Sequence, residues 1–149
     1  MAKIEIRTAT LEDAAAIAAL SAQLGYASSR GRIERRLNAL SKSGDHAVFV
    51  ACTPGSGVVG WVHVFQTQRV ESDAFSELGG FVVAESCHGR GIGRSLLAAA
   101  EKWVKARGVA TLRVRSRSSR SGAHAFYERM GFSLVKEQHV YDKSLGPIA

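Results

Sequence analysis

The chain has little cysteine and no long apolar run, and both shortages exclude classes of protein. Its 149 residues include two cysteines, Cys52 and Cys87, which make no disulfide framework and stand at no metal-ligand spacing. No apolar stretch approaches the ~18 residues that span a bilayer, and the N-terminus alternates in polarity instead of carrying the apolar core of a signal peptide. We therefore expect a cytoplasmic protein with no bound metal and no membrane contact.

The rest of the composition is typical of one folded domain. The chain is 46% hydrophobic and 22% charged, and domains commonly contain about 100–150 residues. No linker, repeat or low-complexity segment divides the sequence. It therefore predicts a single domain over residues 1–149.

The net charge of +7 is concentrated in the C-terminal part of the chain. From Arg90 onward there are twelve Lys and Arg residues against four acids, whereas eight basic residues face nine acids before that point. Such an excess attracts a polyanion, either nucleic acid or a phosphate-rich cofactor. Nucleic acid is the weaker alternative, because neither interleaved aromatic residues nor a recognition-helix pattern accompanies the charge.

Apolar periodicity predicts strands and helices in the order β-α-α-β-β-β-α-β-α-β-β, an α/β (α+β) chain with a mixed, mostly antiparallel sheet. Thr10 is the expected N-cap of the first helix, with Asp13 three residues later. Gly79 and Gly80 interrupt the fourth strand and predict a bulge or a close approach of another segment. The expected strands cover 3–8, 47–52, 58–67, 75–83, 109–115, 132–135 and 138–145.

A glycine-rich turn lies between the fourth strand and a long amphipathic helix. It reads His88-Gly89-Arg90-Gly91-Ile92-Gly93 and is followed by Arg94. Glycine lets backbone N–H groups approach an anion closely, and a helix N-terminus adds unpaired donors and partial positive charge. The alternative is a plain strand-to-helix connection. A Walker loop and a dinucleotide fingerprint both fit poorly, because no lysine follows Gly93 and the turn lies mid-chain after a hairpin-rich half.

The chain resembles the GNAT superfamily of N-acetyltransferases over essentially its whole length. The turn matches the family signature Arg/Gln-x-x-Gly-x-Gly/Ala, with His88 replacing Arg or Gln. A second signature, Ala-x-x-Phe-Tyr-x-x-x-Gly-Phe, is matched from Ala123 to Phe132. An asparagine that often precedes this second signature is missing, and Arg120 stands there instead. The resemblance implies a GNAT-like sheet of six to seven strands with four helices on its faces, and acetyl-CoA as the co-substrate.

The resemblance also implies roles for individual residues. Glu77 would be the general base for the amine, and Tyr127 the general acid for the departing thiolate. The alternatives are a sheet-edge charge paired with an arginine for Glu77, and core packing for Tyr127. Backbone groups of the fourth strand would pair with the pantetheine arm, one amide polarising the thioester carbonyl, and amides of the turn would hold the pyrophosphate. The implied cofactor-binding residues are Phe81, Val82, Val83, His88, Gly89, Arg90, Gly91, Ile92, Gly93, Arg94 and Arg120.

The implied reaction is direct transfer of an acetyl group to a primary amine of a small molecule or peptide within a ternary complex. The first two helices with their loop 24–30, together with the loop 66–73, would form the acceptor site. Glu71 and Asp73 favour a cationic acceptor, whereas arginines of the second helix disfavour one, so the acceptor stays open. Members of the family often form homodimers, and the sequence leaves the oligomeric state of this chain open. Two other functions stay open: a catalytically inert acyl-CoA sensor, and a basic nucleic-acid-binding regulatory module on the same fold.

Two further features each have two interpretations. His63 alternates with valines on the strand 58–67, where it either packs or borders the acceptor cleft. Arg113, Arg115 and Arg117 alternate along the strand 109–115 and just beyond it, and so project to one face. They either attract the 3′-phosphate of the cofactor or face solvent.

Overall fold

The computed structural model describes residues 3–148, which form two compact units. The first unit runs up to Arg115 and holds the sheet, and the second begins at Ser116 and holds α4 (Ser121–Arg129). No helix within residues 3–148 combines the length and the apolar composition that a bilayer crossing requires.

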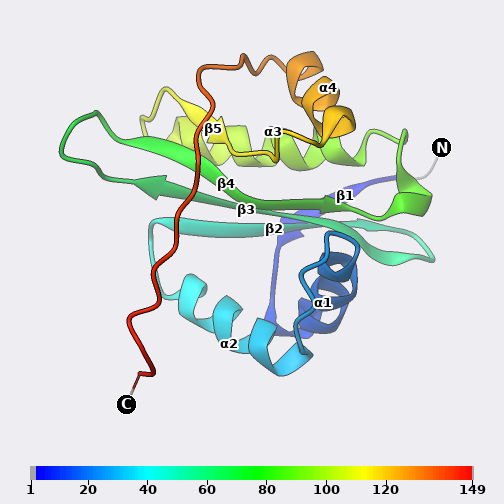
Figure 1. Cartoon of the computed structure of the whole chain (residues 1–149). Coiled ribbons are helices and arrows are strands. Elements are labelled where there is room, and N and C mark those ends of the chain that lie inside the picture. The colour runs from blue at the N-terminus through cyan, green and yellow to red at the C-terminus, as the bar shows by residue number, and fades with distance from the viewer. Residues whose placement is uncertain (1–2, 149) are drawn as a thin grey trace. The chain divides into compact units, whose positions relative to one another are not determined.

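The first unit is built on a five-stranded mixed sheet whose strands lie side by side in chain order (Figure 1). The first four strands pair antiparallel, and the fifth joins the fourth in parallel. This confirms the expected mixed, mostly antiparallel sheet. The strands are β1 (Glu5–Thr8), β2 (His46–Thr53), β3 (Gly57–Thr67), β4 (Phe75–Val83) and β5 (Leu112–Val114).

Helices cover both faces of this sheet, α1 (Ala14–Ala22) and α2 (Arg30–Ser41) on one side and α3 (Ile92–Ala106) on the other (Figure 1). Gly60 of β3 lies against Leu96 of α3, so this residue marks the α3 face of the strand. Burial of apolar side chains holds these helices on the sheet: α2 and α3 each carry an apolar stripe, whereas α1 is apolar on almost every side. The buried stripe of α3 is Ile92, Leu96, Leu97, Ala100 and Val104, and the core under α1 and α2 contains Ala14, Ile17, Ile33 and Val50.

The sheet has five strands within residues 3–148 instead of the six to seven expected. Residues 132–135 and 138–145, expected as the last two strands, have no regular secondary structure. Their large apolar side chains are exposed, Leu134 at 79% and Val140 at 85%. Alternating polarity provides a face that can pack, but a strand also needs a partner strand, and tertiary context decides that pairing. The two expected C-terminal strands are therefore not formed.

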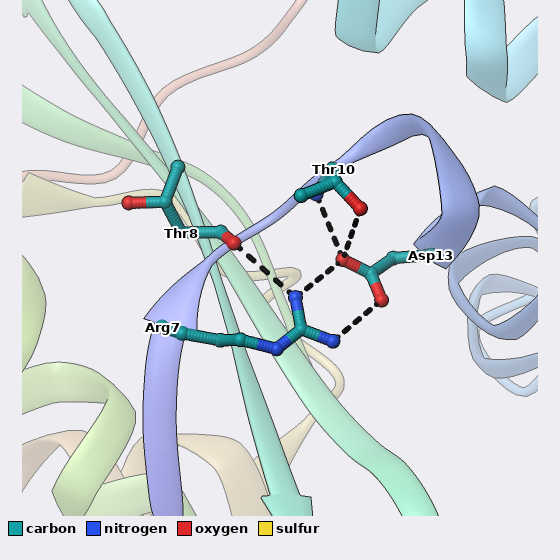
Figure 2. A network of polar contacts seen from close by, with 4 residues as sticks. All are labelled: Arg7, Thr8, Thr10 and Asp13. Carbon is teal, nitrogen blue, oxygen red and sulfur yellow. Dashed lines mark hydrogen bonds and ion pairs between the residues drawn. The ribbon is translucent and has the colours of Figure 1, made fainter.

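A nearly buried carboxylate holds the turn between β1 and α1 (Figure 2). Thr10 precedes a short 3-10 turn, and its backbone N–H donates to Oδ2 of Asp13 at 2.8 Å. Both oxygens of Asp13 also accept from the guanidinium of Arg7, each at 2.8 Å. These charge-assisted bonds hold the pKa of Asp13 below its usual range. The expected cap at Thr10 is confirmed, and this network fixes where the first helix begins.

Candidate active site

The middle of β4 carries a bulge. Its register with β3 shifts between His63 and Val64, which leaves Gly79 as an extra residue on β4. A Cβ on Gly79 would lie 2.5 Å from Nδ1 of His63, and a Cβ on Gly80 would lie 2.4 Å from the ring of Trp61. The sequence predicted a bulge or a close approach at the glycine pair, and both are present.

The bulge changes which residues share a face with Glu77. Strict alternation places Gly79 and Phe81 beside it. After the extra residue, however, Gly80 pairs with His63 and Val82 pairs with Trp61. Partners in an antiparallel pair point to the same face, so Gly80 and Val82 lie on the face of Glu77, and Phe81 lies on the α3 side.

The parallel pairing of β4 with β5 is short. Ser76–Leu78 pair with Leu112–Val114, and no strand of the described residues pairs with this side of β4 from Gly79 to Val83. A strand edge without a strand neighbour can receive an extended ligand as an added strand. The edge includes Phe81, Val82 and Val83, the residues expected to meet the pantetheine arm.

The glycine-rich turn leads from β4 into the N-terminus of α3. Gly89 and Gly91 have φ values of +82° and +80°, a left-handed conformation that favours glycine. Within the described residues, no amide from Gly89 to Arg94 donates to a backbone carbonyl, as expected for the start of a helix. Arg90 and Arg94 are exposed beside these amides. The turn therefore gathers free N–H donors, positive side chains and the positive end of a helix dipole, which together suit an anion.

His88, the departure from the family signature, is engaged with the end of β4. Its Nε2 lies 3.0 Å from the carbonyl oxygen of Val83. A carbonyl only accepts, so Nε2 carries the proton and donates it. The side chain of His88 therefore holds the turn against the strand, and its backbone N–H donates to the carbonyl oxygen of Glu85 at 3.3 Å.

One row of side chains crosses four strands on the face away from α3. His46, Phe65, Glu77 and Arg113 are successive register partners on β2, β3, β4 and β5. The side chain of Glu77 is 13% exposed, and its Oε1 accepts from Nε of Arg115 at 3.0 Å. The arginine pairing that sequence left open for Glu77 is thus present. This ion pair keeps the carboxylate of Glu77 on this face, and a catalytic role for Glu77 stays a prediction.

His63 forms a hydrogen-bonded pair with His46 beside this row. Its Nε2 lies 2.9 Å from Nδ1 of His46, 17 residues away in sequence, and both rings contact the ring of Phe65. Burial, and after it the proximity of His46, lower the pKa of His63 from 6.5 to about 4. Sequence gave no signal for this pair, because it depends on the strand register.

We expect His63 to make the protein less stable in mild acid. The unfolded chain takes up a proton near pH 6.5 and the folded chain near pH 4, so stability falls as the pH drops between these values. One proton accounts for at most about 1.4 kcal/mol per pH unit. Denaturant unfolding from pH 7.5 to 4 should show a shallower decline for His63→Gln than for the wild type. The exposed His139 serves as control, since His139→Gln should follow the wild type; parallel curves for all three proteins would contradict the assignment.

The second unit holds the other two predicted residues, on or next to α4. Arg120 is the N-cap residue of this helix. Tyr127 packs edge-on against Phe126 and Phe132, with ring centroids 5.6 and 5.5 Å apart. Burial raises the pKa of Tyr127, while the charge of Arg120 acts in the opposite direction. Tyr127 thus packs, as one interpretation expected, and also keeps the protonated form that a general acid needs.

The described residues offer no metal centre. No three His, Cys, Asp or Glu side chains within residues 3–148 are grouped so that they could hold an ion. Cys52 and Cys87 are free thiols, and Cys87 is buried beside the glycine-rich turn.

Comparison with known proteins decides the family. Residues 12–132 match the model of the Acetyltransferase (GNAT) family. The chain belongs to the GNAT acetyltransferase family. It is therefore an acyltransferase by family, with the glycine-rich turn and β4 inside the matched region.

Individual relatives agree with this placement. The GNAT chain is 32% identical to aminoglycoside N(6')-acetyltransferase type 1 of Stenotrophomonas maltophilia, over 97% of this chain and 95% of that protein. A transcriptional regulator from Bacillus halodurans C-125 has the same fold, with a TM-score of 0.84 at 22% identity over 95% of this chain and 100% of that one. AAC(6')-Iy in complex with a bisubstrate analogue of CoA gives a TM-score of 0.83 at 18% identity, over 95% of this chain and 99% of that one. At such identities these solved structures show the fold.

Proposed function

We propose that this GNAT protein transfers an acetyl group from acetyl-CoA to a primary amine of a small molecule or peptide, directly and within a ternary complex. The observation that carries the proposal is that β4 leads directly from Glu77 into the glycine-rich turn. Its edge from Gly79 to Val83 has no strand neighbour among the described residues and leads into a turn rich in free amide donors, and Glu77 lies two residues before that edge. The pantetheine arm would lie along the edge, and the pyrophosphate would bind the free amides from Gly89 to Arg94.

The proposed chemistry needs one base, one oxyanion donor and one acid. Glu77 takes a proton from the ammonium group of the acceptor, because the neutral amine is the nucleophile. A backbone amide of β4 donates to the thioester oxygen as the C–N bond forms and negative charge develops there. The C–S bond then breaks, and Tyr127 protonates the thiolate. The new amide nitrogen gives up its extra proton, and that proton restores Tyr127. Arg120, at the start of α4, would contribute positive charge toward the cofactor.

An aminoglycoside amine is a second candidate acceptor. The relative from Stenotrophomonas maltophilia is named for acetylation of aminoglycosides at N(6'), and the similarity extends over nearly the whole chain. The exposed acids Glu71 and Asp73, in the loop between β3 and β4, are compatible with a cationic acceptor.

A panel of primary amines, assayed for thiol release from acetyl-CoA, tests the proposal. We expect release with at least one amine, and stabilisation of the protein against heat by acetyl-CoA, since a ligand that binds the native state raises its stability. Stabilisation without release by any amine would point to an acyl-CoA sensor. If acetyl-CoA does not stabilise the protein and no amine releases thiol, the nucleic-acid-binding module is the surviving alternative.

The cytoplasmic location and the homodimer stay predictions from the sequence. Free Cys52 and Cys87 fit a reducing compartment. Sedimentation analysis of the purified chain at several concentrations would decide between a monomer and a dimer.

We expect Tyr127→Phe to lower kcat by about 10²-fold and to leave the KM for acetyl-CoA within about twofold, because loss of a general acid affects the chemical step. Since burial raises the pKa of Tyr127, the wild type should keep its activity up to a pH above the usual tyrosine value of about 10. Steady-state kinetics against pH measure both effects. Tyr141→Phe makes the same deletion at an exposed site and should be silent. Unchanged kcat in Tyr127→Phe would assign the residue to packing.

A further inference from the structure

Basic side chains gather at one place beside Glu77. Phe75 lies two residues before Glu77 on the same face of β4 and is 5% exposed. The guanidinium carbon of Arg113 lies 4.2 Å from the centre of the Phe75 ring, and that of Arg69 lies 5.3 Å from it. Arg115 binds Glu77 itself. We call Arg69, Arg113 and Arg115 the arginine cluster.

Two members of the arginine cluster have stacking contacts but no anionic partner. Across residues 3–148, no salt bridge or hydrogen bond engages the guanidinium of Arg69 or Arg113. Stacking on a ring uses the flat face of a guanidinium and leaves its N–H edges directed outward. Those edges match the oxygens of a carboxylate or a phosphate in a two-bond arrangement. Arg113 is half-buried, so an anion bound there would be screened less by water than at an open surface.

The proposed pyrophosphate site is too far away to supply that anion. Arg113 is the register partner of Glu77, whereas the anion-binding turn begins beyond Val83. Val83 comes six positions after Glu77, and a strand rises about 3.3 Å per residue, which gives about 20 Å. The cluster therefore lies at the amine end of the proposed site, away from the pyrophosphate end.

Acids in the neighbouring loop do not cancel the cluster. Glu71 and Asp73 are exposed, and neither forms an ion pair with the cluster in the described residues. Exposed charge pairs contribute about 1 kcal/mol or less, because water and salt screen them. Arg113 is one strand away from Glu77 and half-buried, so its charge has the larger effect on a bound acceptor.

We propose that the arginine cluster selects an acceptor whose molecule carries an oxyanion, a carboxylate or a phosphate, a few bonds from the amine. This rests on the proposed function, since it places the amine at Glu77. Neighbouring strands are about 4.8 Å apart, so Arg113 holds the oxyanion while Glu77 meets the amine of the same small molecule. A polycation such as an aminoglycoside meets three guanidinium groups at this place and is disfavoured.

Matched acceptor pairs test the proposal in the full chain with saturating acetyl-CoA. The pairs are phosphoethanolamine with ethanolamine, and β-alanine with β-alaninamide; spermidine and neamine represent polycations. We expect kcat/KM to be about tenfold higher for the anionic member of at least one pair, and the preferred pair identifies phosphate or carboxylate as the oxyanion. Arg113→Gln should lower that value about tenfold through KM, and Arg113→Lys should lower it less, because lysine keeps the charge without the two-bond geometry. Each variant is compared on the same acceptor, so differences in amine basicity cancel.

Controls separate recognition from a loss of sheet structure. Lys102→Gln removes one exposed positive charge from α3, on the opposite face of the sheet. It should leave kcat/KM unchanged for every acceptor. The neutral members should respond less than about twofold to Arg113→Gln. Equal rates within both pairs, a preference for polycations, or an equal loss for charged and neutral acceptors in Arg113→Gln would overturn the proposal.

A binding measurement keeps the inference testable if the proposed function fails. If no amine releases thiol, the melting temperature is measured with CoA and each member of the pairs. A rise with phosphoethanolamine or β-alanine in the wild type, absent in Arg113→Gln, would support the anion site on a non-catalytic protein. No rise in either protein would reject it.

Discussion

Glu77→Gln should lower kcat/KM by about 10³-fold, within the 10²–10⁴-fold range that general base catalysis supplies. Glutamine has the shape of glutamate, and its amide oxygen can still accept the bond from Nε of Arg115 that lies at 3.0 Å. The change therefore removes the base while leaving the local geometry in place. Initial rates of thiol release with the best amine of the panel measure the effect.

Two further variants separate a base from a mere charge partner. Arg115→Gln breaks the same ion pair but leaves the carboxylate, so it should remain at least tenfold more active than Glu77→Gln. Glu34→Gln breaks an exposed ion pair on α2, with Arg30 at 2.7 Å, and should behave as the wild type. Equal activity losses in Glu77→Gln and Arg115→Gln would mean that the ion pair matters and that Glu77 is not the base.

Features that depend on neighbouring residues could be predicted from the sequence. Thr10 and Asp13 are three residues apart, and they form the expected cap. Gly91 precedes an apolar stripe of helical spacing, and its left-handed backbone starts α3. The bounds of β4 also match the expected 75–83, because turn residues end it on both sides. In each case the physical cause lies within a few residues, so the sequence itself contains it.

Features that depend on register could not be predicted. The hairpin of β2 and β3 pairs Thr53 with Gly57, and continuing that register would place His46 opposite Val64. A shift between Ala51 and Cys52 instead places His46 opposite Phe65. A one-residue shift moves a side chain to the other face, so the pairing of His46 with His63 depends on a single bulge. The bulge at Gly79 has the same effect on β4, where it places Phe81 on the face opposite Glu77.

The arginine cluster shows the same limit. Alternation placed Arg113 and Arg115 on one face of a strand, and that part needed no structure. Their partners, Phe75 and Glu77, come from a parallel strand about 37 residues earlier, and three pairs of residues fix that register. Parallel pairing through a long connection leaves no local signal in sequence, so the contacts of Arg113 and Arg115 with β4 could be seen only in the fold.

Gly80→Ala should destabilise the protein by about 3 kcal/mol or more. Its Cβ would lie 2.4 Å from Cη2 and 2.6 Å from Cζ3 of the Trp61 ring. This ring packs against the core under α1 and α2, so it cannot move aside as a flexible side chain would. Overpacking in such a core commonly costs 1–3 kcal/mol, and a rigid ring places this case at or above the upper end. Denaturant unfolding measures the loss.

The control and a double mutant separate a clash from the general effect of a methyl group on a glycine. Gly44→Ala adds the same group where nothing lies within 4 Å, and it should change stability by less than about 1 kcal/mol. Trp61→Leu removes the ring, so Gly80→Ala should cost clearly less in that background, a coupling that a double-mutant cycle measures. Equal costs in both backgrounds would contradict the contact. Because Gly80 also lies on the face of Glu77, one residue past the bulge, the same contact sets how closely the indole approaches the strand that carries the proposed base.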